Sequence, residues 1–401
     1  MPAVATVAAP AIPSEADLLA RARQLTPVLR ERAQRTEESR SLLPETLQDF
    51  IDLGIYRALQ PAKYGGYEMS PLSVFKVAME LAKGCPSSAW CASLITIHNW
   101  EIALLDPRAA DDLWAGDPDA RASSSYAPFG KVTRVEGGYR ISGRWSWSSG
   151  SDHCSWVILG GVVPRETPDG PPDVRAFIIP RSDYKVVDVW HVLGLKGTGS
   201  NDIVVEDAFV PEHRTHQFFH SFMMADPGRA VFTSRNYKYP FGVIFAYSLS
   251  VITIGIADGA LEAFREDMKV RLGAYDGAKA MEEPFVRHRL AEAEAIIRGL
   301  HQRLEANFAE MDALIDAGEP IPLDVRVRNK WDAQWIAKEA MKAVELLFKA
   351  SGARGIKLES PMQRYFRDIH AISNHAFLNA DKGSLNAGLV GLGGTTTDFT
   401  L

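Results

Sequence analysis

The segment that decides the fold is KVTRVEGGYRISGRW, residues 131–145, near the middle of a 401-residue chain. Apolar and polar residues alternate on both sides of Gly137-Gly138, and a period of two is typical of strands that bury one face. A glycine pair between two such runs favours a hairpin turn. Further along, VRAFIIP, YKVVDVW and NDIVVEDAFV predict more strands. The sequence therefore predicts a β-domain at residues 119–225.

Helices are predicted on both sides of this β-domain. Before it, Ser14 and Asp17 resemble a capping box, while Pro44 and Gly54 mark the start and the end of a second helix. After about Pro240, long runs with helical periodicity return. The expected fold is mostly α with a central β-domain. Its parts are a disordered lead-in at 1–13, an N-terminal helical domain at 14–118, the β-domain, and a C-terminal helical bundle with a tail at 226–401.

Composition narrows the function classes. A chain with 46% hydrophobic and 23% charged residues is typical of a globular protein. The net charge of −6, without clustered lysine and arginine, argues against nucleic-acid binding. The first thirteen residues lack the basic start of a secretory signal, and no later run is expected to cross a membrane. Cys85, Cys91 and Cys154 form no CxxC pair, which suits reduced thiols in the cytoplasm.

Glycine-rich segments do not form a dinucleotide-binding fingerprint. Both Gly194–Gly199 (GLKGTG) and Gly391–Gly394 (GLGG) have their glycines in the wrong order for G-x-G-x-x-G. Any redox activity therefore needs electrons from another protein or from the substrate.

An aromatic and hydroxyl-rich segment, GRWSWSSG at residues 143–150, ends the predicted hairpin. Trp145 and Trp147 alternate along a strand, so both are expected on one face, with the serines opposite or at the strand end. A flat aromatic wall beside hydroxyl groups suits a flavin ring. Two ordinary core tryptophans are the alternative explanation.

Histidines supply the other candidates. His98 and His375 lie in helical regions, and a functional role would require them to meet in space, since a lone histidine is more often structural. His213, His216 and His220 have a spacing that could place them on one helix face, but no carboxylate or cysteine close by completes a zinc site. We expect no metal.

Four strings together resemble one family: SSSYAPFG, WSWSSGSDHCSW, DVWHVLGLKGTGSNDIVVEDAFVPEHR and QRYFRDIHA. They are similar to the oxygenase components of group D two-component flavin-dependent monooxygenases, which share the acyl-CoA dehydrogenase fold. The resemblance runs from about Leu18 to the C-terminal helices. It is greatest to enzymes that hydroxylate the phenolic ring of a cleaved steroid, and the 4-hydroxyphenylacetate 3-hydroxylase oxygenase is more distant. It implies a β-barrel-like middle domain, a C-terminal four-helix bundle, and a homotetramer or at least a dimer.

The resemblance also implies site residues. Ser149 is expected to reach flavin N5, and Arg271 to cross a subunit interface to a neighbour's flavin phosphate. Substrate is expected to contact His98, Ser124 and His375, with His375 as the base that takes a phenolic proton. The implied flavin-binding residues are Trp90, Ser124, Ser125, Tyr126, Trp147, Ser148, Ser149, Arg271, Ser351 and Gly352.

One difference separates the chain from the acyl-CoA dehydrogenases that the family resembles. Counted from Arg367-Asp368, the position of their catalytic glutamate falls near Ala376, which carries no carboxylate, and His375 stands beside it. An imidazole can ionise a phenol near neutral pH. The expected activity is that reduced FMN or FAD from a separate NAD(P)H-dependent reductase reacts with O2. The resulting C4a-hydroperoxyflavin would then hydroxylate an apolar, phenolic substrate ortho to its hydroxyl group.

Three alternatives stay open at this point. The same flavin chemistry could act on an indole, a sulfur heterocycle or an amine; the chain could be an acyl-CoA dehydrogenase or oxidase; or it could be a noncatalytic flavin- or lipid-binding scaffold. The tail GLVGLGGTTTDFTL differs from the steroid enzymes, and Ser234–Lys238 offers no match for the arginine that holds the carboxylate of 4-hydroxyphenylacetate. Substrate identity and the choice between FMN and FAD therefore remain unassigned.

Overall fold

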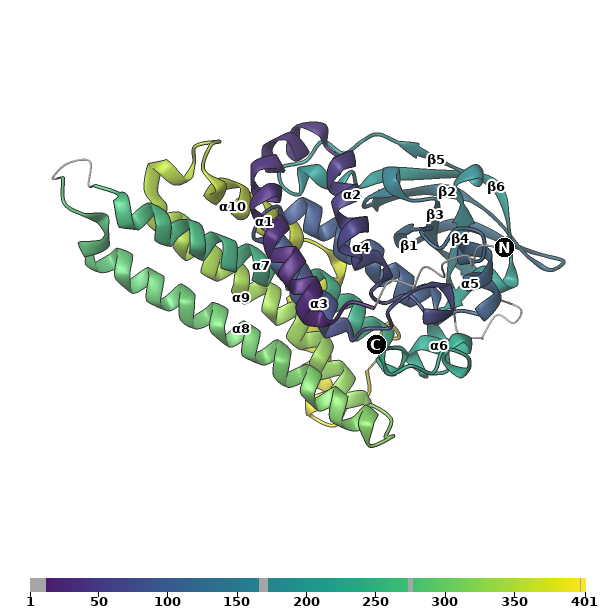
Figure 1. The fold of residues 1–401 in the computed structure, drawn as a ribbon. Helices are drawn as coiled ribbons and strands as arrows, with labels where there is room; N and C mark the ends of the chain where they lie inside the picture. Colours follow the sequence, from purple (N-terminus) through teal and green to yellow (C-terminus); the bar gives the residue numbers. More distant parts are fainter. Residues whose placement is uncertain (1–11, 166–171, 273–276, 397) are drawn as a thin grey trace, which may run out of the picture.

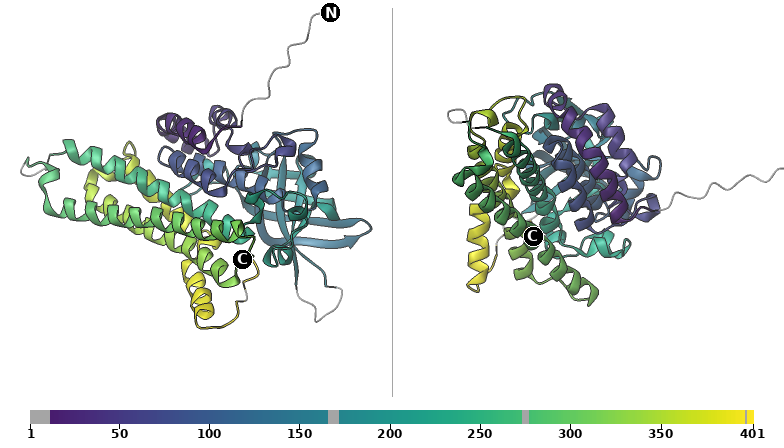
Figure 2. Two further views of the ribbon diagram at one scale, coloured as in Figure 1. Left: turned by 60° about the horizontal axis from the view of Figure 1, so that its bottom comes forward. Right: turned by 60° about the vertical axis from the view of Figure 1, so that its left-hand side comes forward.

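The computed structural model describes residues 12–165, 172–272, 277–396 and 398–401. A sheet lies at one end of the molecule and a bundle of long helices at the other, with shorter N-terminal helices packed against both (Figures 1 and 2). Most of the expected lead-in lies outside the described residues. The expected fold class is confirmed, while the domain boundaries at residues 118 and 225 stay a prediction.

Within the described residues five α-helices precede the sheet, and local sequence determines where they begin and end. The Ser14 hydroxyl accepts from the backbone N–H of Asp17, so the capping box is confirmed. Gly54 ends its helix in the left-handed conformation at φ +89°, which favours glycine. The helices are α1 (Glu15–Ser39), α2 (Pro44–Leu53), α3 (Pro71–Ala82), α4 (Pro86–Ile102) and α5 (Pro107–Trp114).

The middle of the chain forms one mixed sheet with the order β5-β6-β2-β1-β3-β4-β7. Only the β1–β3 pairing is parallel within the described residues. β4 and β6 stand four places apart in this order yet approach each other, so the sheet is strongly curled around its own apolar core. Its strands are β1 (Ala122–Val135), β2 (Gly138–Ser148), β3 (Trp156–Val163), β4 (Asp173–Pro180), β5 (Tyr184–Val187), β6 (Asn201–Pro211) and β7 (Thr215–Gln217).

The predicted hairpin is present, with its turn one residue earlier than expected. Val135 pairs with Gly138, so the two turn residues are Glu136 and Gly137, and Gly137 has φ +76°. Gly138 already belongs to β2, where a Cβ atom would stand 2.2 Å from the carbonyl oxygen of Val210. The second glycine is thus required by close strand packing rather than by the turn.

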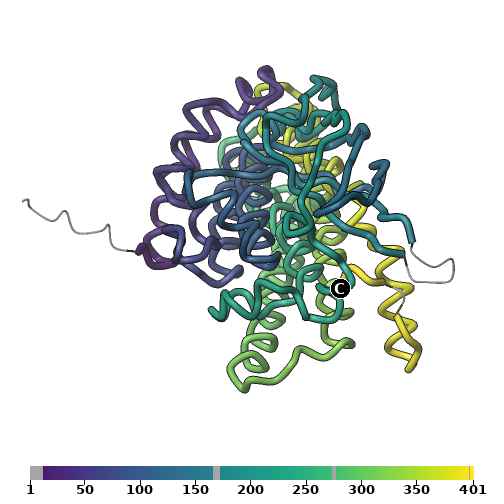
Figure 3. The backbone as a smooth tube through the Cα atoms, turned by 90° about the vertical axis from the view of Figure 1, so that its right-hand side faces the viewer, coloured from purple at the N-terminus to yellow at the C-terminus, as the bar shows by residue number. Residues whose placement is uncertain are grey.

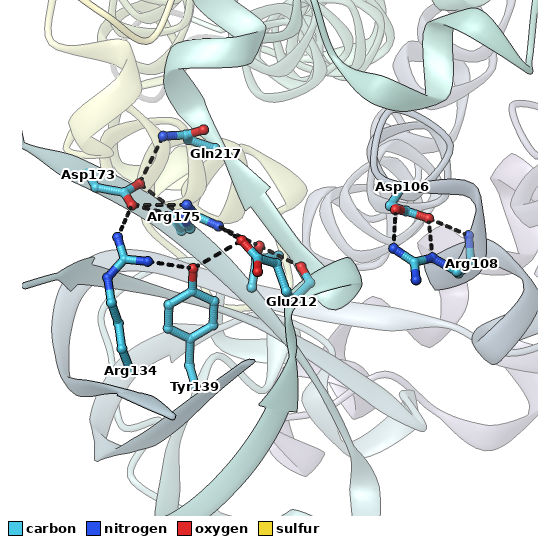
Figure 4. A network of polar contacts seen from close by, with 9 residues as sticks. Asp106, Arg108, Arg134, Tyr139, Asp173, Arg175, Glu212 and Gln217 are labelled. Atoms are coloured by element: carbon cyan, nitrogen blue, oxygen red, sulfur yellow. Dashed lines mark hydrogen bonds and ion pairs between the residues drawn. The ribbon is translucent and has the colours of Figure 1, made fainter. Parts of the chain in front are cut away.

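A network of polar side chains joins β1, β4 and β7 at one edge of this sheet. Asp173 accepts hydrogen bonds from Arg175, Arg134 and Gln217, which come from three different strands (Figure 4). Gln217 lies in β7, so the network holds that short strand against β4. This position matters because β7 also carries His216.

The long helices after the sheet form the C-terminal bundle. α7 (Phe241–Val270), α8 (Pro284–Asp316), α9 (Leu323–Gly355) and α10 (Pro361–Ser373) pack on one another, after the short α6 (Phe218–Phe222) and before α11 (Ala380–Gly391). α7 also packs on α3 and α4. By length and composition α7 could span a membrane, contrary to the expectation that no run reaches that length. However, 94% of its most apolar window is buried inside the fold, so it is a core helix.

The chain ends against this bundle, close to the start of α7 (Figure 3). The buried Lys330 of α9 bonds to the Asp398 carboxylate at 2.7 Å and to the Thr400 carbonyl at 3.1 Å. Gly242 leaves room for the Thr400 carbonyl, which would stand 1.5 Å from a Cβ atom there. The Leu401 side chain is fully buried. The last residues are therefore part of the packed structure.

Candidate active site

A chain of buried hydroxyl groups begins where β2 ends. The Trp90 indole N–H of α4 donates to Ser149 Oγ at 3.0 Å. Ser149 Oγ lies 2.7 Å from Ser200 Oγ, which lies 2.6 Å from Thr198 Oγ1. All four residues are less than 8% exposed. α4 and two segments of the β-domain thus meet at Ser149.

His375 stands next to this chain. Its ring lies 5.8 Å from the Trp90 ring, in an edge-to-face arrangement. The backbone N–H of Phe377 donates to His375 Nδ1 at 3.2 Å, so Nδ1 carries a lone pair and the proton of the neutral ring is on Nε2. Although the residue keeps some solvent exposure, protein atoms surround the ring and burial lowers the pKa of His375 to about 4. His375 is therefore a neutral hydrogen-bond donor at pH 7.

His98 has the opposite proton arrangement. Its Nδ1 lies 2.8 Å from the carbonyl oxygen of Ala122, which can only accept, so Nδ1 carries the proton. Burial lowers the pKa of His98, against the opposing effects of Glu101 and the Ala122 carbonyl. His98 Nε2 is buried and has no hydrogen-bond partner in the part of the chain that the structure describes. The ring therefore holds an unused acceptor, which is costly unless a ligand satisfies it.

Aromatic rings connect the two histidines. The His98 ring lies 6.4 Å from Phe245 of α7, Phe245 lies 4.9 Å from Phe377, and Phe377 lies 6.4 Å from His375. Tyr126 of β1 also packs on His98 and Phe245, at 6.3 and 5.2 Å. The histidines that the sequence placed far apart thus lie along one apolar wall, which suits a ring-shaped ligand with a single polar group.

A buried charged network holds Tyr126 in place. The Tyr126 hydroxyl donates to Glu101 of α4, and the other Glu101 oxygen bonds to His216 Nδ1 at 2.8 Å. His216 Nε2 lies 3.2 Å from Asp226, whose second oxygen accepts from Arg229 Nε at 2.6 Å. Burial alone would lower the pKa of His216, but Asp226 and Glu101 raise it to about 9. His216 is therefore a buried imidazolium between two carboxylates.

His213, His216 and His220, whose spacing could have placed them on one helix face, lie in three different elements. His213 lies in a 3-10 turn and bonds to Asp112 at 2.7 Å, His216 lies in β7, and His220 lies in α6. Because a strand interrupts the run, the three side chains do not share a helix face. Within the described residues no group of His, Cys, Asp or Glu is placed to hold a metal ion.

The two tryptophans of β2 do not share a face, contrary to the expectation. Trp145 is fully buried in the sheet core, whereas Trp147 is 64% exposed and has φ +69°. The pairing of β2 with β6 shifts register between Trp145 and Ser148, and such a bulge breaks the alternation of side chains. Trp145 is an ordinary core residue, and Trp147 is free to contact a ligand.

Two of the predicted flavin residues already use their hydroxyl protons within the sheet. Ser125 donates to the Ser146 carbonyl at 2.8 Å, and Ser148 donates to Ser123 at 3.0 Å. Both bonds join β1 to β2, so these serines hold the strands beside Ser149 together. Ser124 faces the Tyr126 hydroxyl instead, on the side of the aromatic wall.

Arg271, Ser351 and Gly352 come together at the far end of α7. Arg271 Nη1 donates to the Ser351 carbonyl at 2.8 Å. Gly352 has φ +57° within α9, and a Cβ atom there would stand 3.1 Å from Arg271 Nη2. Twenty-six residues of helix separate Phe245 from Arg271, about 39 Å at 1.5 Å per residue. Arg271 therefore cannot share a pocket with His98 of the same chain.

Comparison with known proteins identifies the family of this chain. The acyl-CoA dehydrogenase N-terminal and C-terminal domain families match residues 15–104 and 247–380. The oxygenase subunit HsaA of a flavin-dependent monooxygenase from Rhodococcus jostii is 40% identical over 93% of this chain and 98% of its own length. The crystal structure of 3-HSA hydroxylase from Rhodococcus sp. RHA1 has a TM-score of 0.91, with 39% identity, over 96% of this chain and 99% of that one. This chain belongs to the flavin-dependent monooxygenase oxygenase subunits.

A more distant relative is the p-hydroxyphenylacetate 3-hydroxylase oxygenase component of Acinetobacter baumannii, 32% identical over 92% of this chain and 87% of its own length. The chain described here, as an oxygenase subunit, is an enzyme that uses flavin and O2, and it works with a separate partner protein. The dehydrogenase alternative is not favoured. At the position expected for the dehydrogenase base stands Ala376, in the turn that carries His375.

Sequence reasoning missed several residues of the oxygenase site. Thr198 and Ser200 lie in one of the strings that carry the family resemblance, but neither was named as a site residue, and Glu101 and His216 were not connected. The only local signal was a polar residue inside an apolar helix, Glu101, one turn after His98. Its partners come from β1 and β7, and pairings at that sequence distance leave no mark on a single sequence.

Proposed function

We propose that this oxygenase subunit receives reduced FMN or FAD from a separate NAD(P)H-dependent reductase in the cytoplasm and hydroxylates an apolar phenol ortho to its hydroxyl group. The observation that supports a phenolic substrate is that His98 Nε2 is a buried acceptor on an aromatic wall, without a partner among the described residues. A phenol supplies both the donor for this nitrogen and the flat apolar ring for Phe245 and Phe377.

The residues around Ser149 fit a flavin. Ser149 has a free lone pair, Trp90 fixes its hydroxyl, and the exposed Trp147 offers an aromatic surface. These residues would hold the ring, with the Ser124–Tyr126 strand along it. Reduced flavin, when bound, supplies the electrons that activate O2 and passes one oxygen atom to the substrate. The buried aromatic walls exclude the water that would divert this chemistry.

The two histidines have different roles, one as a proton acceptor and the other as a hydrogen-bond donor. His98 accepts the phenolic proton at Nε2, because that nitrogen has a lone pair and no other partner. His375 presents its Nε2 proton and donates a hydrogen bond, because the Phe377 amide occupies Nδ1. The family resemblance implies that His375 is the base, and that assignment stays a prediction. The contacts on both rings favour His98 for this role.

The function is tested by a single-turnover reaction. The purified protein is mixed anaerobically with reduced FMN or FAD and a trial phenol, and ¹⁸O2 is then added. We expect a catechol carrying one labelled oxygen atom. Oxidation of the flavin at the rate seen without protein, with only hydrogen peroxide formed, would contradict the proposal. Reduction of bound oxidised flavin by an acyl-CoA would instead indicate an acyl-CoA dehydrogenase.

Flavin binding across a subunit interface gives a further prediction. Because Arg271 lies about 39 Å along α7 from Phe245, it supports the flavin of a second copy, in a homotetramer or at least a dimer. Arg271→Ala should weaken binding of reduced flavin by about 10- to 100-fold, since hydrogen bonds to charged groups contribute about 1.5–3 kcal/mol. Anaerobic equilibrium dialysis measures this affinity.

The matched control for that variant is Lys269→Ala, two residues earlier. Its exposed ammonium pairs only with Glu266 among the described residues, one turn back on the same helix. This control should bind reduced flavin as the unaltered protein does. Equal loss in both variants would mean that general positive charge matters rather than the Arg271 contact.

A further inference from the structure

The hydroxyl chain behind Ser149 has a direction, and Thr198 sets it. The Thr198 hydroxyl lies 3.0 Å from the Leu195 carbonyl, which can only accept, so the Thr198 proton is used there. Ser200 must then be the donor in its 2.6 Å contact with Thr198. With the Ser200 proton used, Ser149 must be the donor in its 2.7 Å contact with Ser200.

The opposite direction would leave a buried proton without a partner. If Thr198 donated to Ser200 and Ser200 to Ser149, the Ser149 proton would have no acceptor among the contacts of this chain. In the first direction every hydroxyl proton has an acceptor, and Ser149 only keeps a spare lone pair. A buried donor without an acceptor costs about 1–3 kcal/mol, so the first direction is favoured.

The Leu195 carbonyl, which accepts from the last of these hydroxyl groups, is itself held in position. Leu195 has φ +53°, an unusual conformation for a branched side chain. Its N–H donates to Asp368 of α10 at 2.7 Å, and its carbonyl also accepts from the Trp190 indole at 2.9 Å. Leu195, whose carbonyl fixes the Thr198 proton, is therefore held both by Trp190 and by Asp368 of the C-terminal bundle.

We propose that Thr198 and Ser200 make Ser149 a hydrogen-bond acceptor only, so that the site selects reduced over oxidised flavin. Reduced flavin carries a proton on N5 and can donate it to Ser149, whereas oxidised flavin has only a lone pair there. Two lone pairs facing each other repel, and Ser149 has no proton to spare. This inference rests on the proposed placement of flavin N5 beside Ser149.

The test compares the dissociation constants of oxidised and reduced flavin in the intact protein, each measured anaerobically by equilibrium dialysis. In Ser200→Ala the Ser149 proton loses its acceptor and becomes available to oxidised flavin. We expect the oxidised form to bind about tenfold tighter than in the unaltered protein, so that the preference for reduced flavin falls about tenfold. Thr198→Val should act in the same direction, because the Ser200 proton then turns towards Ser149.

The control is Ser151→Ala, which deletes a buried hydroxyl that has no partner among the described residues and is not a member of the series Ser149, Ser200 and Thr198. It should leave the preference unchanged. If the unaltered protein binds both flavins but neither Ser200→Ala nor Thr198→Val changes their ratio, the inference is wrong and the proposed function stands. If the unaltered protein binds neither flavin, the placement of the cofactor is wrong and both fall.

Discussion

Replacing His98 with alanine should lower the rate of phenol hydroxylation by about 10²- to 10⁴-fold, the range typical of a lost general base. The structural reason is that His98 Nε2 is the buried acceptor without a partner on the aromatic wall. Flavin binding should persist, since the hydroxyl chain at Ser149 receives no contact from His98. The measurement is the yield of catechol and of hydrogen peroxide per reduced flavin oxidised. Hydrogen peroxide should replace catechol almost completely.

Two further variants separate this role from a merely structural one. His375→Ala should lose a donor but keep the base, so product should still form, at a lower yield. His288→Ala changes an exposed histidine of α8 and should behave as the unaltered protein does. If His375→Ala abolishes product while His98→Ala retains it, the roles of the two histidines are the reverse of those proposed here.

The second large effect concerns stability and pH. The proton of His216 binds more tightly in the folded protein, where its pKa is about 9, than in the unfolded chain, where it is near 6.5. A raised pKa contributes stability that is complete below pH 6.5 and is lost as the pH rises through 9. The His216 proton therefore contributes about 3 kcal/mol to the free energy of unfolding, because each unit of difference between the two pKa values is worth about 1.36 kcal/mol. Urea unfolding followed by tryptophan fluorescence at pH 6.5, 8 and 9 should show this loss.

His216→Gln should destabilise the protein by about 3–5 kcal/mol at pH 6.5, because it leaves Glu101 buried without a cation and Asp226 with Arg229 alone. It should also remove most of the pH dependence between 7 and 9. The control is His301→Gln, since Asp258 also raises the pKa of His301 but the pair is partly exposed. An identical pH dependence in His216→Gln and the unaltered protein would contradict the buried imidazolium.

Much of the fold followed from local sequence rules. Pro44 and Gly54 bound a helix because proline lacks an N–H that a first turn does not need and glycine adopts positive φ without strain. The alternation in residues 131–145 gave the hairpin because a strand turns its side chains to opposite faces. The turn still moved by one residue, since the need for close packing at Gly138 is set by β6, not by its neighbours in sequence.

The site depended far more on tertiary structure. The family resemblance implied Trp90, Ser149 and His375 as site residues, and the fold does bring these three residues together. The bulge that separates Trp145 from Trp147 arises from pairing with β6, so no rule of strand alternation could reveal it.

What the sequence by itself determined is the order of helices, sheet and bundle, together with the residue types that suit a flavin oxygenase. These depend on interactions between residues a few positions apart, which a single sequence displays. Only the tertiary structure decided which ring nitrogen of each histidine carries the proton, which way the hydroxyl chain runs, and that His216 is charged. Each of these is fixed by a partner from a distant segment, because a proton is placed by the atom opposite it and not by its neighbours in the chain.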